Sequence, residues 1–330
     1  MTELRPDLVE ALAALYFDAR VETLPGDAST RRFHRLFLAE GGTRIVMDYG
    51  ARFDGETDDV RLARIFERAT LPVARVLDVL PEAGAIVLED LGDTTLETAL
   101  ARSGADGRPS RGALYREAVR LAVAIATRGT AVLSSSDRAS GPALDEDRFR
   151  FEMDFFLQHF VGDYLGREDV NASLRAALYD LAREVASHPR VLCHRDFHSR
   201  NIMVRSDDSF AMVDIQDARW GPDTYDIGSL LCDAYVELEA RESEDLFALY
   251  WSSLPGRPDR NPMRVRYELS TAQRMIKALG TFGYQIAVRG RPRYAEALDH
   301  TRDRLSRVLP AQRSTANLAR LIESSKILRP

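Results

Sequence analysis

The sequence predicts an α+β fold in two lobes, a small antiparallel β lobe over residues 1–91 and a mainly helical lobe over residues 92–330. Short hydrophobic runs separated by turn residues follow one another as far as Leu91. Long segments with helical periodicity come after it. Among these helical segments lies a polar stretch, residues 191–222, that carries most of the candidate functional side chains.

Each expected element rests on its hydrophobic period and on the turn residues that bound it. Helices are expected at 5–19, 56–69, 95–101, 114–131, 145–165, 174–187 and 227–238. Strands are expected in a strand–loop–strand unit over 21–36, at 43–48, 73–80 and 85–88, and in a hairpin over 202–213. Residues 89–93 follow the last strand of the first lobe and are expected to connect the lobes.

The composition is that of an ordinary globular chain of 330 residues, with 45% hydrophobic residues, 29% charged residues and a net charge of −6. The acidic balance argues against nucleic acid as a partner. No apolar run approaches the roughly 20 residues of a membrane span, and the N-terminal segment does not resemble a signal peptide. Cys193 and Cys232 have no metal-binding spacing, so we expect buried thiols in a reducing compartment, which fits a cytoplasmic protein. A monomer or a weak homodimer is expected.

The polar stretch contains His194-Arg195-Asp196, then Asn201 five positions after the aspartate, then Asp214 at the end of a hydrophobic run. The predicted hairpin would bring Asn201 and Asp214 to neighbouring strand ends. Their amide and carboxylate oxygens are ligands that Mg²⁺ prefers, and Asp196 can orient an attacking hydroxyl. This spacing is the catalytic arrangement of protein kinases, so the sequence predicts Mg²⁺-dependent phosphoryl transfer from ATP.

Two departures from the protein-kinase pattern indicate which group of kinase-like proteins the sequence resembles. Asp214 is followed by Ile-Gln rather than Phe-Gly, and His198 stands two residues after Asp196. The chain therefore resembles the aminoglycoside phosphotransferase and choline kinase group, which has a protein-kinase-like fold and phosphorylates small molecules. Within that group, the segments most similar to the bacterial anomeric N-acetylmuramate/N-acetylglucosamine kinases are HRDFHSRNIMV, VDIQDARWGPDTYDIGSLL, KALGTFGYQ and GDASTRRF. This resemblance implies phosphorylation of the anomeric hydroxyl of an N-acetyl amino sugar in cell-wall recycling.

The nucleotide is expected to bind against the first lobe. Gly26, Ala28 and Ser29 form a small-residue loop that lets backbone amides approach phosphates closely. The resemblance implies that the carbonyl of Glu89 and the amide of Leu91 pair with the adenine edge at the hinge between the lobes.

The first lobe lacks the lysine that protein kinases carry on the strand expected at 43–48. Met47 or Asp48 occupies that region, and the first 90 residues contain no lysine. A guanidinium group suits phosphate oxygens, and Arg31, Arg32 and Arg44 are the available arginines. We prefer Arg32, at the edge between the loop and the strand.

Further residues are expected around the catalytic loop. The resemblance implies that Asp226 holds the loop's backbone amides from beneath. Asp217 either helps to hold the metal site or contacts the substrate. His198 is either packed under the loop or a substrate contact, and we favour the structural role. Glu152 and Asp154, on the helix at 145–165, are either substrate contacts or solvated charges, and we favour solvated charges.

Residues 261–310 contain ten Lys and Arg against four Asp and Glu, although the whole chain is acidic. Arg274 and Lys277 lie in this segment, close to one helical face, and are expected near the acceptor. Cations there suit a neutral or anionic acceptor, such as the lactyl carboxylate of N-acetylmuramate.

Two alternatives stay open. The first is a kinase of the same fold that acts on another small alcohol, such as an aminoglycoside, choline, homoserine or a different sugar. The second is a nucleotide-binding pseudokinase that acts as a scaffold, which the missing strand lysine suggests. Protein-kinase activity is disfavoured because no Ala-Pro-Glu motif or long activation segment follows Asp214.

Overall fold

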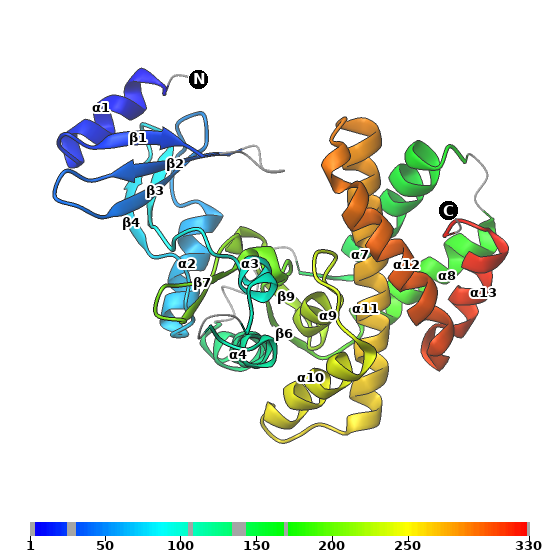
Figure 1. Cartoon of the computed structure of the whole chain (residues 1–330). Coiled ribbons are helices and arrows are strands. Elements are labelled where there is room, and N and C mark those ends of the chain that lie inside the picture. The colour runs from blue at the N-terminus through cyan, green and yellow to red at the C-terminus, as the bar shows by residue number, and fades with distance from the viewer. Residues whose placement is uncertain (1–3, 25–30, 105–107, 134–142, 168–170, 329–330) are drawn as a thin grey trace. The chain divides into compact units, whose positions relative to one another are not determined.

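The computed structural model describes residues 4–24, 31–104, 108–133, 143–167 and 171–328 (Figure 1). The chain forms two compact units, one made of residues 1–94 and 203–216 and the other of residues 95–202 and 217–330. The segment 203–216, which the sequence analysis placed in the helical lobe, thus belongs to the first unit.

The first unit is built on a five-stranded antiparallel sheet, which confirms the sheet predicted for the N-terminal part. The strand order is β1-β2-β3-β5-β4. The strands are β1 (Arg20–Thr23), β2 (Arg32–Phe37), β3 (Thr43–Asp48), β4 (Val76–Leu80) and β5 (Ala85–Glu89). Gly84 ends the turn into β5 with a φ of 58°, and a Cβ there would lie 2.0 Å from the carbonyl oxygen of Ala51.

One helix packs on each face of this sheet. Successive strand residues point to opposite faces, and Val46 and Met47 of β3 therefore enter different clusters. Val46 lies in a cluster with Leu8 of α1 (Pro6–Leu15). Met47 lies in a cluster with Val60 of α2 (Asp58–Arg68). The α2 helix begins at Thr57, whose side chain accepts a hydrogen bond from the amide of Val60.

A short hairpin, β7 (Ile202–Val204) and β8 (Phe210–Met212), adds to the first unit. Met203 and Ala211 pack with Leu91 in a small apolar cluster. The amide of Val204 donates to the carbonyl of Thr94, and the amide of Met212 donates to the carbonyl of Pro72, both at 2.8 Å. These bonds tie the hairpin to the segments that flank β4 and β5.

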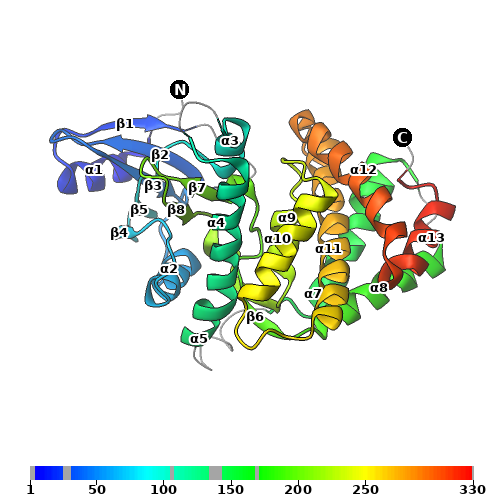
Figure 2. The ribbon, with the colours of Figure 1, turned by 60° about the horizontal axis from the view of Figure 1, so that its bottom comes forward.

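The second unit is mainly helical (Figure 2), as the sequence predicts. Its α-helices are α3 (Leu96–Ala101), α4 (Arg111–Ala124), α5 (Thr130–Val132), α7 (Glu146–Phe156), α8 (Ala172–Ala186), α9 (Tyr225–Leu231), α10 (Ala240–Ser253), α11 (Arg260–Gly283), α12 (Ala295–Ala311) and α13 (Ala316–Ser324). Wider π-helical turns continue α4, α7 and α11 over 125–129, 157–164 and 284–288. Two strands, β6 (Arg190–Cys193) and β9 (Arg219–Pro222), pair antiparallel.

The long helix α11 lies at the centre of this unit and packs against α7, α8, α9 and α12. Two glycines permit its close approach to α7 and to the π-helical turns after it. A Cβ on Gly280 would lie 2.8 Å from the Cα of Phe156, and one on Gly283 would lie 2.6 Å from the carbonyl oxygen of His159. The glycines of the segment KALGTFGYQ therefore have a packing role.

The structure differs from the sequence-based expectation at α9. The predicted helix continues to Leu238, but α9 ends at Leu231. Beyond it, Asp233 accepts hydrogen bonds from the amides of Ser199 and Tyr235, so this residue serves a loop rather than a helix. Among the described residues, no helix combines the length and apolarity needed to cross a membrane.

Candidate active site

The loop from His194 to Asn201 follows β6, and two carboxylates from beyond β9 hold its backbone. The Oδ2 atom of Asp226 accepts from the amide of His194 at 2.7 Å, and its Oδ1 accepts from the amide of Arg195 at 3.0 Å. These are the contacts that the resemblance implies for Asp226. Arg195 has a φ of 79°, a conformation costly for a residue with a side chain, and the bonds to Asp226 stabilise it.

Asp233 supports the far end of the loop, and the sequence analysis did not select it. Its Oδ2 accepts from the amide of Ser199 at 2.7 Å, and its side chain is buried. It lies two residues beyond the end of α9, in a segment that the sequence analysis took for helix. No pattern in the sequence distinguished it from the other acids there.

Asp196 faces two cations of α11. Its Oδ1 lies 3.0 Å from Nζ of Lys277 and 3.2 Å from Nη1 of Arg274, and its side chain is 22% exposed. Burial by itself raises the pKa of Asp196, but Lys277, Arg274 and Arg195 outweigh it and hold the pKa well below its usual range. Asp196 is therefore a carboxylate at neutral pH and a weak base, better suited to orienting a hydroxyl than to removing its proton.

The positions of the two cations, Arg274 and Lys277, follow from these contacts with Asp196. Arg274 also donates from Nη2 to the hydroxyl of Ser229 at 2.6 Å. Burial lowers the pKa of Lys277, and the charge of Asp196 opposes that shift. Arg274 and Lys277 thus lie beside Asp196, at the place where an acceptor hydroxyl would meet that carboxylate.

A buried ion network lies behind Asp196. Nη2 of Arg195 is 3.3 Å from Oε1 of Glu152, and Nη1 is 2.8 Å from Oδ1 of Asp217. Oε2 of Glu152 accepts from the side-chain amide of Gln273 at 2.7 Å. Glu152 is 4% exposed, so the expectation of a solvated charge is wrong for it. The helical face of α7 that carries Met153 and Phe156 also turns Glu152 toward the loop.

The two residues whose roles the sequence left open have the following neighbours. Asp217 pairs with Arg195 and also, at 2.7 Å, with Nη2 of Arg219. His198 packs edge-on against Tyr235, with ring centroids 5.5 Å apart. Burial lowers the pKa of His198, with Asp233 and Asp196 opposing the shift. Both side chains therefore have structural contacts within the second unit.

Asn201 closes the loop through its side-chain nitrogen. Nδ2 donates to the carbonyl of Asp196 at 2.9 Å and lies 3.5 Å from Nε2 of His198. The amide is thereby oriented by its nitrogen, and its oxygen is of the type that hard cations bind.

Asp214 belongs to the first unit and follows β8 by two residues. Its side chain is exposed, its φ is 62°, and its Oδ1 accepts from the side-chain amide of Gln216 at 2.6 Å. Asn201 directly precedes β7, so the β7–β8 hairpin separates the two candidate metal ligands along the chain.

The other residues expected at the nucleotide are placed as follows. Gly26, Ala28 and Ser29 lie outside the described residues. Leu91 is buried against the hairpin, and the Glu89 side chain pairs with Arg75 at 3.2 Å, so only the backbone at 89–91 is suited to an adenine edge.

The structure separates the candidate arginines by the pleat of the sheet. Arg32 is exposed and pairs in register with Asp48, on the α1 face. Arg44 donates from Nη1 to the carbonyl of Thr43. Arg31, just before β2, lies on the α2 face and pairs with Asp59 at 2.7 Å. The preferred Arg32 thus points away from the face that carries Met47.

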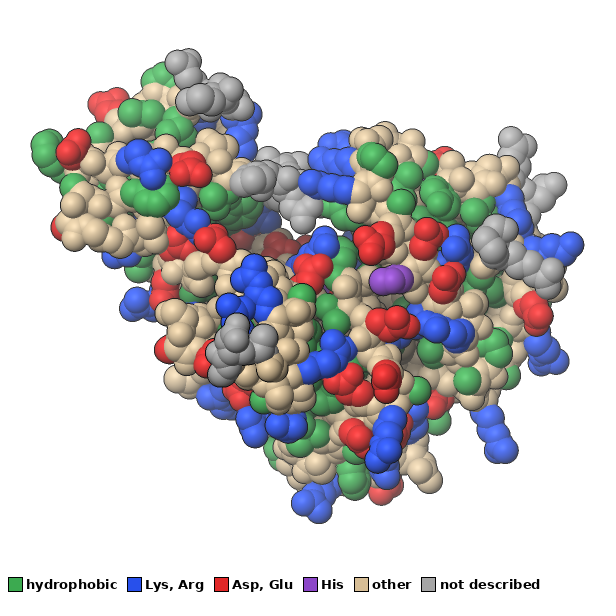
Figure 3. Space-filling view, in the orientation of Figure 1, with side chains coloured by type: hydrophobic (Ala, Val, Ile, Leu, Met, Phe, Trp, Pro, Cys, Tyr) green, Lys and Arg blue, Asp and Glu red, His purple; other side chains and the backbone are tan. Residues whose placement is uncertain are grey.

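Part of the basic excess over 261–310 is neutralised by acids from other elements. Arg264 pairs with a carboxylate of α10. Arg266 pairs with a carboxylate of the loop before α9, and Arg307 pairs with one of the loop after α9. On the face shown in Figure 3, acidic and basic side chains of the second unit are interspersed. Part of the basic segment is therefore neutralised by acids, and Arg274 and Lys277 connect it to the catalytic loop.

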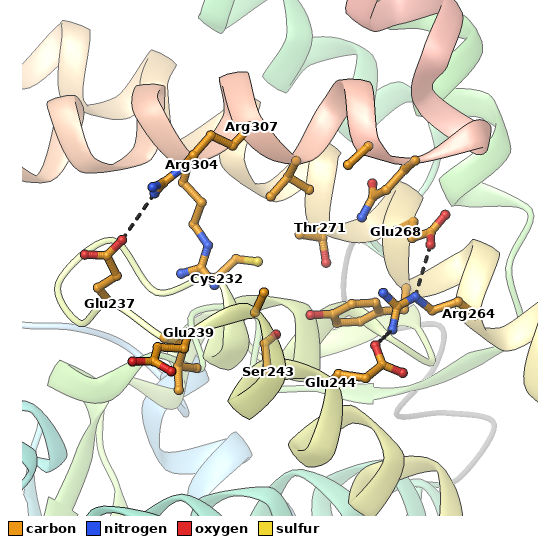
Figure 4. Close-up of a pocket in the computed structure, with 16 residues that line it drawn as sticks. Cys232, Glu237, Glu239, Ser243, Glu244, Arg264, Glu268, Thr271, Arg304 and Arg307 are labelled. Carbon is orange, nitrogen blue, oxygen red and sulfur yellow. Dashed lines mark hydrogen bonds and ion pairs between the residues drawn. The ribbon is translucent and has the colours of Figure 1, made fainter.

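A cavity of about 540 Å³, lined by both charged and apolar side chains, lies among α10, α11 and α12 (Figure 4). Arg264 stands between Glu244 and Glu268 there, and Arg307 pairs with Glu237. Both acidic and basic side chains line the cavity, and Asp196 is not part of its lining. The cavity therefore lies apart from the catalytic loop.

This loop, its carboxylates and the two-part fold define a kinase-like phosphotransferase. The model of the phosphotransferase enzyme family matches residues 20–266, and the chain belongs to this family. It is a kinase that transfers phosphate from ATP to a hydroxyl group.

Two curated relatives show how far the similarity extends. The N-acetylmuramate/N-acetylglucosamine kinase of Neisseria meningitidis is 28% identical over 290 residues, which cover 86% of this chain and 83% of that protein. The enzyme of the same name from Pseudomonas aeruginosa is 29% identical over 283 residues, covering 83% and 79%.

Solved structures show the same fold at lower identity. The choline kinase LicA from Streptococcus pneumoniae superposes with a TM-score of 0.55 at 15% identity, covering 88% of this chain and 96% of that chain. The ADP-bound aminoglycoside phosphotransferase APH(2'')-Ib superposes with a TM-score of 0.57 at 13% identity, covering 96% and 99%. These likenesses confirm the predicted protein-kinase-like fold.

Proposed function

We propose that this chain is an ATP- and Mg²⁺-dependent kinase that phosphorylates the anomeric hydroxyl of N-acetylmuramate, N-acetylglucosamine or both. The observation that carries the substrate class is the similarity to four curated kinases with these two sugars in their names, each over at least 83% of this chain. Phosphorylation at this position would suit a cytoplasmic enzyme of cell-wall recycling.

The environment of Asp196 supports the anomeric position. A hemiacetal hydroxyl is more acidic than an ordinary alcohol, so it needs less help in losing its proton. Asp196, paired with Lys277 and Arg274, is a weak base that can accept a hydrogen bond from this hydroxyl and aim its oxygen at the γ-phosphate. The two cations have two possible roles beside Asp196. They can offset charge on the transferring phosphoryl group, or they can bind a carboxylate of the acceptor.

In this proposal Asn201 and Asp214 hold the metal ion. Both side chains suit this role, because Asn201 is oriented through its side-chain nitrogen and Asp214 has an exposed carboxylate. Mg²⁺ would neutralise charge on the phosphates and orient them. Asp226 and Asp233 are positioning residues, since they act on the loop backbone. Asp217 and His198 support the loop.

The test is phosphate transfer with a panel of N-acetylmuramate, N-acetylglucosamine, glucose, kanamycin and choline. We expect ATP consumption only with the N-acetyl sugars, and loss of their reducing end as C1 is phosphorylated. Phosphate on another hydroxyl or another acceptor would overturn the substrate assignment but retain the kinase.

Two variants serve as controls for this test. Asp196→Asn should abolish transfer, whereas Asp180→Asn should not, since Asp180 is an exposed residue of α8 whose side chain pairs with Arg183. Nucleotide binding without turnover of any acceptor would favour the scaffold alternative.

A further inference from the structure

Strand β3 of the first unit lacks the lysine that protein kinases carry at this place. The register of the sheet shows that Met47, rather than Asp48, occupies the position facing α2, because Met47 packs with Val60 of that helix. Asp48 faces the other way and pairs with Arg5 at 3.0 Å. In protein kinases a lysine on this strand pairs with an acid on the following helix and binds nucleotide phosphates. Met47 can do neither.

The guanidinium group of Arg31, the residue just before the neighbouring strand β2, lies beside Met47. Nη1 of Arg31 is 3.4 Å from Sδ of Met47. The same nitrogen is 2.7 Å from Oδ1 of Asp59, in the first turn of α2. An arginine next to β2 thus makes the strand-to-helix ion pair that a lysine on β3 would make. Compared with a protein kinase, the positive charge lies next to β2 instead of on β3, and its acidic partner is again on the helix that follows β3.

Two further contacts hold this pair in place. The hydroxyl of Tyr49 donates to Oδ2 of Asp59 at 2.5 Å, so both carboxylate oxygens are engaged. The guanidinium carbon of Arg31 lies 5.8 Å from the centre of the Tyr49 ring. Side chains held from two sides lose little further freedom when a ligand binds.

The charge of Asp214, the candidate metal ligand of the same unit, also acts on the guanidinium group of Arg31. Burial lowers the pKa of Arg31, but Asp59, Tyr49 and Asp214 raise it, and the pKa lies above its ordinary value. The side chains of Arg31 and Asp59 are 16% and 14% exposed, so the pair is accessible at one side. A guanidinium carries five N–H donors in a planar fork, which can bond a carboxylate and phosphate oxygens together.

We propose that Arg31, positioned by Asp59 and Tyr49, binds the α- and β-phosphates of the nucleotide and so replaces the missing β3 lysine. This rests on the proposed function only in requiring a nucleotide as phosphate donor. It takes the place of the earlier preference for Arg32, which lies on the opposite face of the sheet. It also answers the argument for an inactive pseudokinase, since the cation is present beside another strand.

The test compares Arg31→Met with Arg32→Met, because the two arginines are adjacent in the chain and face opposite sides of the sheet. Calorimetry with Mg-ATP, Mg-ADP and adenosine measures binding without any acceptor. We expect Arg31→Met to weaken Mg-ATP and Mg-ADP binding about 10- to 100-fold, the range of one or two charge-assisted hydrogen bonds, and to leave adenosine binding unchanged. Arg32→Met should change all three less than about twofold.

Two more variants separate phosphate binding from a structural role. Arg31→Lys should restore most of the Mg-ATP affinity, because it keeps the charge, and Asp59→Asn should weaken Mg-ATP while sparing adenosine. Equal losses for Mg-ATP and adenosine, or a lower melting temperature with unchanged Mg-ATP affinity, would overturn the proposal. Failure of the sugar panel would not affect these binding measurements, so the two hypotheses are tested independently.

Discussion

The two units hold their candidate functional side chains in different ways. In the second unit, buried carboxylates bond directly to backbone amides of the catalytic loop, as Asp226 does at His194 and Arg195. In the first unit, Arg31 and Asp59 form a partly exposed pair, and Asp214 is exposed. Hydrogen bonds from amides to a buried charge stabilise a conformation more than partly exposed ion pairs do. We therefore expect changes in the second unit to lower both turnover and stability, and changes in the first to act mainly on nucleotide affinity.

The largest effect is expected at Asp196. Replacing it with Asn removes the acceptor that aligns the hydroxyl, and general acid–base and positioning roles contribute about 10²- to 10⁴-fold. We expect kcat to fall by that range while KM for ATP changes little, as measured by steady-state kinetics. A variant with kcat within tenfold of the parent would show that another group orients the acceptor.

Asp226→Asn should show that loop geometry matters apart from chemistry. The amide keeps one acceptor atom but loses the charge that bonds two amides, so we expect a loss of about 1–3 kcal/mol in the free energy of unfolding. Displacing the loop by about 1 Å would lower kcat on the order of 100-fold. Urea denaturation and kinetics measure both. Asp59→Asn, the same change in the first unit, should lower the free energy of unfolding by less than about 1 kcal/mol; an equal loss at both sites would contradict the comparison.

Gly280→Ala tests the packing that sets the position of α11. The new Cβ would lie 2.8 Å from the backbone of Phe156, so helices must separate, and overpacking costs about 1–3 kcal/mol. Because Arg274 and Lys277 are on α11, KM for the acceptor should rise as well. Gly112→Ala in α4 is the matched control, since within the described part of the chain a Cβ there would meet only the flexible end of Arg116. A Gly280→Ala variant as stable as this control would contradict the close approach.

The last prediction concerns His188, a residue of the second unit that is 5% exposed. Within the described residues, neither of its ring nitrogens has a hydrogen-bond partner. Burial, with a smaller contribution from Arg266, lowers the pKa of His188 to about 4. An unfolded histidine titrates near 6.5, so between these values the unfolded state binds more protons and stability is lost as pH falls.

The measurement for His188 is the free energy of unfolding between pH 7 and pH 4. His188→Gln should reduce its slope by up to about 1.4 kcal/mol per pH unit, the value for one proton. His300→Gln, at an exposed position of α12, should leave the slope unchanged. An unchanged slope in His188→Gln would show that this histidine is not responsible for acid lability.

Short-range patterns in the sequence predicted the main elements and the catalytic stretch. Hydrophobic alternation marked the strands, and the spacing of Asp196, Asn201 and Asp214 identified phosphoryl transfer. The same reasoning placed Arg274 and Lys277 near one helical face, and both lie beside Asp196. It was wrong for Glu152, because helical periodicity shows which face a residue occupies but not which partner buries it.

The sequence by itself predicted phosphoryl transfer, because Asp196 and Asn201 are separated by a few residues whose spacing local structure enforces, and Asp214 ends the hydrophobic run that follows. Only the tertiary structure showed that Asp233, about 30 residues downstream, also holds that loop, and that Lys277, about 80 residues downstream, contacts the carboxylate of Asp196. The pleat of the sheet likewise turns Arg31 toward α2 and Arg32 away from it. Such contacts depend on how helices and strands pack, and adjacent residues of one type are not distinguished until that packing is known.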